Sequence, residues 1–125
     1  MNGERILIIE DDHDIRTCLR EALEMAGCVV FSAVNGKAGL EMLLQMVPPD
    51  LIVLDQNMPL LSGPEFLRIK NATPQISPIP VIVVSASTDQ CRSLGAVEFH
   101  KKPVDLERLL AAMKRHCPAV KLTDR

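Results

Sequence analysis

Apolar residues occur along this chain in short, nearly unbroken runs rather than in strict alternation with polar ones. Runs of this kind are typical of parallel strands that are covered by helices on both faces. The clearest run is central, and it ends at Asp55 just before a Met-Pro turn. The expected strands are Arg5–Glu10, Cys28–Ala33, Leu51–Asp55, Pro80–Ser85 and a shorter Val97–His100.

The segments between these runs carry apolar residues at the 3.6-residue spacing of amphipathic helices. The stripes are Ile15, Leu19, Ala22, Leu23 and Ala26; Leu40, Leu43, Leu44 and Val47; and Leu106, Leu109, Leu110 and Met113. Pro64–Lys70 is a further expected helix, with Pro64 at its first position, and Thr88–Leu94 leaves room for about two turns of another. Five strands alternating with five helices predict a single α/β domain with a doubly wound parallel sheet, for which 2-1-3-4-5 is a known strand order.

The composition narrows the class of protein. The 125 residues suit one domain, expected to span 1–118 with a tail or the start of a linker over 119–125. Hydrophobic residues make up 47% and aromatic residues only 2%, so the chain should fold around an aliphatic core. A formal net charge of -2 argues against a general nucleic-acid-binding surface.

Neither a membrane segment nor a disulfide framework is indicated. No apolar run approaches the roughly 20 residues of a membrane span, and the first residues lack a signal-peptide core, so we expect a cytoplasmic protein without membrane insertion. The cysteines, Cys18, Cys28, Cys91 and Cys117, include no C-x-x-C pair. Reduced, mostly buried thiols are therefore expected.

Polar residues collect where the expected strands end. Glu10 and Asp11 close the first strand, Asp55 the third and Ser85 the fourth, and the fifth leads to Lys102. Because the carboxyl ends of parallel strands lie on one edge of the sheet, these side chains should converge although they are scattered in sequence. The sequence therefore predicts one polar site at this edge.

The residue types in this set indicate phosphoryl chemistry assisted by a metal ion. Three neighbouring carboxylates raise one another's pKa, and a hard divalent cation such as Mg2+ relieves the repulsion. A lysine and a hydroxyl add donors suited to an anion, and a phosphoryl group that shares the metal is the economical candidate. No Gly-rich loop follows the first strand, so a bound nucleotide is not expected. The central Asp55 can then act as a nucleophile that forms an acyl phosphate.

At this point the chain closely resembles the receiver domains of two-component response regulators, from about Arg5 to Cys117. The motifs that carry the resemblance are Ile8–Asp11, Asp55-x-x-Met-Pro59 with Gly63, Val83–Ala86 and Lys102-Pro103. The resemblance implies a flavodoxin-like fold with strand order 2-1-3-4-5. It also implies a signalling phosphoacceptor that catalyses only its own phosphorylation and dephosphorylation.

The resemblance assigns a phosphorylation and metal role to four of these positions. It makes Asp55 the phosphoacceptor, Asp11 the direct Mg2+ ligand and Glu10 a ligand acting through water. The backbone carbonyl of Asn57 would complete the metal site.

Further roles that the resemblance implies concern the anion and the switch. Lys102 would pair with the phosphoryl oxygens, and its bond to Pro103 would be cis. Ser85 matches the switch hydroxyl and Phe99 the aromatic switch residue, so phosphorylation would bias two pre-existing conformations.

The implied partners are a sensor histidine kinase or phosphotransfer domain as donor, and a downstream protein or fused output domain. One departure from the family weakens the output assignment. Only nine residues separate Ser85 from Gly95, about one helical turn fewer than is usual in the family, so the fourth helix should be short or irregular.

Two other functions are compatible with parts of the sequence. A receiver-like interaction module that is not phosphorylated finds its support only in the shortened fourth helix. A phosphatase of the haloacid-dehalogenase type is suggested by Asp12-His13-Asp14 after the first strand. That family needs a longer chain with a cap, and its nucleophile leaves the first strand, whereas here the best-placed carboxylate leaves the third.

Ordinary structural roles, such as helix capping or a surface position, account for several other polar residues. Asp12 and Asp14 fit capping and first-turn positions of the first helix better than metal binding, and Asp105 is the expected N-cap of the last helix. The histidines, His13, His100 and His116, are expected to be isolated surface residues.

Overall fold

The computed structural model describes residues 3–56, 58, 60–86 and 95–117, and these form strands and helices in alternation. In chain order the elements are β1 Arg5–Ile9, α1 His13–Met25, β2 Val29–Ala33, α2 Gly36–Gln45, β3 Leu51–Asp55, α3 Gly63–Asn71, β4 Val81–Ser85, β5 Glu98–Lys101 and α4 Leu106–His116. No helix of this described part is both long and apolar enough to cross a membrane.

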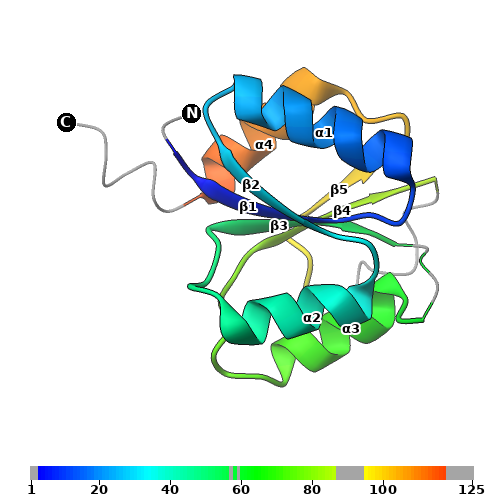
Figure 1. Cartoon of the computed structure of the whole chain (residues 1–125), viewed down its shortest axis with the longest axis vertical. Coiled ribbons are helices and arrows are strands. Elements are labelled where there is room, and N and C mark those ends of the chain that lie inside the picture. Colours follow the sequence, from blue (N-terminus) through cyan, green and yellow to red (C-terminus); the bar gives the residue numbers. More distant parts are fainter. Residues whose placement is uncertain (1–2, 57, 59, 87–94, 118–125) are drawn as a thin grey trace.

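The sheet has five strands in the order β2-β1-β3-β4-β5, and every neighbouring pair is parallel. Helices α1 and α4 cover one face, and α2 and α3 cover the other (Figure 1). This arrangement confirms the α/β class, the doubly wound sheet and the predicted strand order. The expected short helix at Thr88–Leu94 lies outside the described residues, so α4 is the helix expected last in the chain.

Two aliphatic cores, one on each face of the sheet, explain why the strands lack alternation. In β1, Ile6 and Ile8 pack with α1 and α4, whereas Leu7 and Ile9 pack with α2 and α3. All four side chains are fully buried, and so is every residue of β3 and β4. Burial on both faces selects apolar residues at successive positions, which produces the unbroken runs seen in the sequence.

Side-chain caps fix where the helices begin. Asp12 accepts a hydrogen bond from the backbone N–H of Ile15 and Asp105 accepts one from that of Arg108, so both are N-caps, as the sequence predicted. Ser62 forms a capping box with Glu65, which starts α3 at Gly63, one residue earlier than predicted.

The last strand, β5, runs from Glu98 to Lys101, so both predicted ends, Val97 and His100, were one residue too early. Cysteine burial follows the prediction in part. Cys28 and Cys117 are buried, but Cys18 is exposed on α1.

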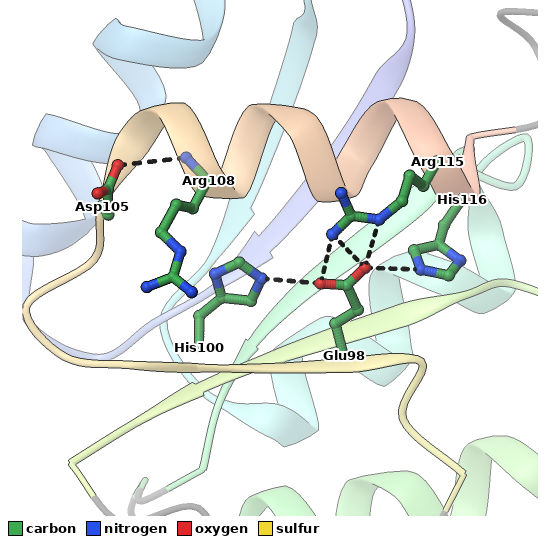
Figure 2. Close-up of polar contacts among 6 residues, drawn as sticks. All are labelled: Glu98, His100, Asp105, Arg108, Arg115 and His116. Atoms are coloured by element: carbon green, nitrogen blue, oxygen red, sulfur yellow. Dashed lines mark hydrogen bonds and ion pairs between the residues drawn. The ribbon is translucent and has the colours of Figure 1, made fainter.

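A single carboxylate joins the edge strand β5 to the end of α4. Glu98 accepts hydrogen bonds from Arg115 at 2.6 to 2.9 Å, and it lies 3.2 Å from Nε2 of His100 and 2.9 Å from Nε2 of His116 (Figure 2). The expectation that His100 and His116 are isolated was therefore wrong. The i, i+2 spacing on β5 puts Glu98 and His100 on one face, and α4 brings His116 to that face.

Hydrogen bonds to this carboxylate hold the pKa of Glu98 below its ordinary value. Partial burial acts in the opposite direction, but the donors from Arg115, His116 and His100 together outweigh it. A depressed carboxyl pKa adds to folding stability above the ordinary value of 4.5, and the contribution is lost as the pH falls through the lower value of the folded state.

We expect Glu98→Gln to lower the free energy of unfolding by about 1 kcal/mol at pH 7, because charge-assisted bonds at a half-exposed site are worth about that much. The difference from the wild type should shrink between pH 7 and pH 3, because the contribution of the carboxylate is lost as the pH falls toward and through its lowered pKa. Urea denaturation at the two pH values measures both quantities. Glu41→Gln, an exposed position on α2, is the control, and an equal gap at both pH values would contradict the assignment.

Candidate functional site

Strand register brings the polar strand ends together. Ile9 pairs with Leu54, so Glu10 and Asp55 follow on adjacent strands. On the next pair of strands, Ser85 lies opposite Lys101, and the backbone N–H of Lys102 donates to the carbonyl of Ser85 at 2.9 Å. The predicted convergence at the carboxyl edge of the sheet is therefore present.

Three carboxylates form the centre of this edge. Glu10, Asp11 and Asp55 each offer an oxygen, and these oxygens lie within 4.8 Å of one another. Glu10 and Asp55 are almost completely buried, whereas Asp11 is exposed. Nζ of Lys102 lies 3.2 Å from an oxygen of Asp55 and 3.2 Å from an oxygen of Glu10.

The electrostatics of the cluster leave excess negative charge. Burial first, and then the neighbouring charge of Asp55, raise the pKa of Glu10 to about 7. The pKa of Lys102 is raised, because attraction to Glu10 and Asp55 outweighs the opposing effect of burial. One ammonium therefore faces three carboxylates, and such an all-oxygen set suits a small hard cation such as Mg2+.

The loop after β3 folds back on itself, so that its last residues lie very close to the backbone of its first residue. Gly63 donates its backbone N–H to the carbonyl of Gln56 at 2.8 Å, and a Cβ at Gly63 would lie 2.8 Å from Cα of Gln56. Leu60 has a φ of 71°, a left-handed conformation that is uncommon for such a residue. Asn57, the predicted backbone ligand, lies outside the described residues.

The remaining predicted residues have definite places. Ser85 is buried at the end of β4, on the strand next to Asp55. Phe99 is half-buried against the core beneath α2 and α3. The bond between Lys102 and Pro103 is cis, as the resemblance implied. The switching roles of Ser85 and Phe99 stay predictions.

One residue next to the acidic cluster was missed by the sequence reasoning. Arg16, in the first turn of α1, donates from Nη1 to the backbone carbonyls of Glu10 at 3.0 Å and Asp11 at 3.3 Å. The available signal was its position four residues after the N-cap Asp12, because long side chains on a helix point back toward its N-terminus.

Comparisons with known proteins agree with this fold. Residues 6–114 match the family model of the response regulator receiver domain. The chain is 29% identical to sporulation initiation phosphotransferase F of Bacillus subtilis, over 94% of this chain and 97% of that protein. It is 37% identical to the KDP operon transcriptional regulatory protein KdpE of Escherichia coli, over 95% of this chain and 58% of that protein.

Solved structures give the same result. The chain superposes with a TM-score of 0.85 and 31% identity on the signal receiver domain of a signal transduction histidine kinase from Syntrophus aciditrophicus, covering 98% of this chain and 96% of that one. It spans about half the length of most of the curated relatives that it matches. With a family match over most of its length and the predicted sheet and acidic edge in place, the chain belongs to the response regulator receiver domain family.

Proposed function

We propose that Asp55 is the phosphoacceptor of this receiver domain and that a histidine kinase or phosphotransfer domain is its donor. The observation that carries the proposal is the position of Lys102, whose ammonium lies 3.2 Å from both Asp55 and Glu10. An ammonium at this place can bind the oxygens of an incoming phosphoryl group while the carboxylate of Asp55 stays within reach of the phosphorus.

In this proposal the transfer is an in-line displacement. An oxygen of Asp55 attacks the phosphorus of a phosphohistidine and forms a P–O bond, while the P–N bond breaks and its electron pair leaves with the imidazole, which takes up a proton. Water attacking the same phosphorus later releases inorganic phosphate and restores the carboxylate. In this proposal the chain catalyses these two steps on itself and acts on no other substrate.

Magnesium is the proposed cofactor, and it would offset the negative charge of the phosphoryl oxygens. Asp11 would bind it directly and Asp55 would share it, while Glu10 would act through water. Asn57 is proposed to add its backbone carbonyl. Lys102 would pair with the phosphoryl oxygens.

Phosphorylation is proposed to act on a partner protein or an output domain through Ser85 and Phe99. The hydroxyl of Ser85 would move toward the phosphoryl group, and Phe99 would turn inward in the space that this leaves. We propose no direct binding of nucleic acid by residues 1–118, the proposed domain, because the formal net charge of the 125-residue chain is -2. The cytoplasmic location stays a prediction. Nothing in the described part of the chain favours a docking module that is not phosphorylated.

Intact-protein mass after incubation with Mg2+ and acetyl phosphate tests the phosphoacceptor. We expect one phosphoryl adduct on the wild type and none on Asp55→Asn, because the amide is a poor nucleophile. Asp14→Asn, an exposed carboxylate in the first turn of α1, is the matched control and should keep the adduct.

An adduct that persists on Asp55→Asn would place the phosphoryl group elsewhere. If acetyl phosphate gives no adduct on the wild type, a phosphorylated histidine kinase or phosphotransfer domain replaces it as donor. Failure with both donors would overturn the proposal in favour of a pure docking module.

Thermal unfolding with and without Mg2+ tests the metal assignment. Mg2+ should raise Tm by a few degrees, because a tenfold excess over Kd stabilises the native state by about 1.4 kcal/mol. Asp11→Asn should lose most of this rise. Sodium chloride at equal ionic strength controls for screening, and an equal rise in both proteins would show that Asp11 does not bind the metal.

A further inference from the structure

The guanidinium of Arg16 is held against the turn that joins β1 to α1. Its Nη1 donates to two successive backbone carbonyls, those of Glu10 at 3.0 Å and Asp11 at 3.3 Å. Its Nη2 lies 3.2 Å from Nδ1 of His13. Because a guanidinium can only donate, Nδ1 of His13 is the acceptor in this contact.

The three carboxylates of the cluster differ in what holds them. Glu10 accepts from the backbone N–H of Asp12 at 3.2 Å and pairs with Lys102. Asp55 also pairs with Lys102. Among the described residues, the carboxylate of Asp11 has neither a hydrogen bond nor an ion pair, so its position depends on the backbone that carries it. Arg16 is the side chain that binds this backbone.

We propose that Arg16 is a positioning residue, which fixes the Glu10–Asp11 backbone and so preorganises the carboxylate of Asp11 for a divalent cation. This inference rests on the proposed metal site. A ligand whose backbone is already ordered loses less conformational entropy when the cation binds. Groups that orient metal ligands in this way typically change metal affinity by about 10- to 100-fold.

The charge of Arg16 acts in the opposite direction to this role, which makes the two effects separable. A guanidinium near the cluster repels Mg2+, so a purely electrostatic effect predicts tighter binding once the charge is removed. A positioning effect predicts weaker binding whether or not the charge remains. Arg16→Lys keeps the charge but lacks the planar fork that reaches two carbonyls and His13, and Arg16→Gln removes the charge.

Calorimetric titration of the full chain with MgCl2 distinguishes these effects. We expect Kd for Mg2+ to rise about tenfold or more in both Arg16→Lys and Arg16→Gln. Arg20→Lys is the matched control, because Arg20 lies one turn later on α1 and donates to Ser32 at 3.1 Å, away from the acidic turn. This variant should bind Mg2+ as the wild type does.

Tm without Mg2+ is measured on the same proteins to detect a merely structural role. A lower Tm with an unchanged Kd in both Arg16 variants would overturn the positioning role, since the residue would then only support the start of α1. Tighter binding by Arg16→Gln would also overturn it, in favour of charge repulsion. A wild type that does not bind Mg2+ would instead overturn the metal assignment, and this inference with it.

Discussion

The rest of this structure depends on repulsion between carboxylates that are buried at the carboxyl edge of a parallel sheet. Glu10 and Asp55 end neighbouring central strands and are almost inaccessible to water, which raises the pKa of Glu10 to about 7. The ammonium of Lys102 offsets only part of the charge. The fold keeps this arrangement because two aliphatic cores fix the register of the strands that carry it.

Much of this could be predicted from the sequence because it depends on periodicity and strand order. Unbroken apolar runs indicated strands buried on both faces, and parallel strands necessarily bring Glu10, Asp55 and Lys102 to one edge. The N-caps Asp12 and Asp105 were also foreseeable, since capping is a local interaction between a side chain and its own helix.

The features that sequence reasoning missed depend on where long side chains end in space. Arg16 reaches back over the acidic turn, and Arg115 and His116 meet Glu98 from an element 17 and 18 residues away in the chain. These contacts depend on how far α1 and α4 are rotated about their own axes as they pack on the sheet. The spacing of the hydrophobic residues fixes this rotation only to within a fraction of a turn. The same limit explains the error about His116, whereas the contact of His100 follows from the i, i+2 spacing along β5.

The alternation of β1 between the two cores ties folding and chemistry to one register. A slip of one residue along β3 would move Ile6 and Ile8 from the α1 and α4 side to the opposite face. It would also carry Glu10 past Asp55 by one strand position. A deletion within β1 that shifts Glu10 by one position therefore disturbs the acidic edge and the core packing together. Inside the central strands, an insertion or deletion therefore disturbs the core and the acidic edge at once.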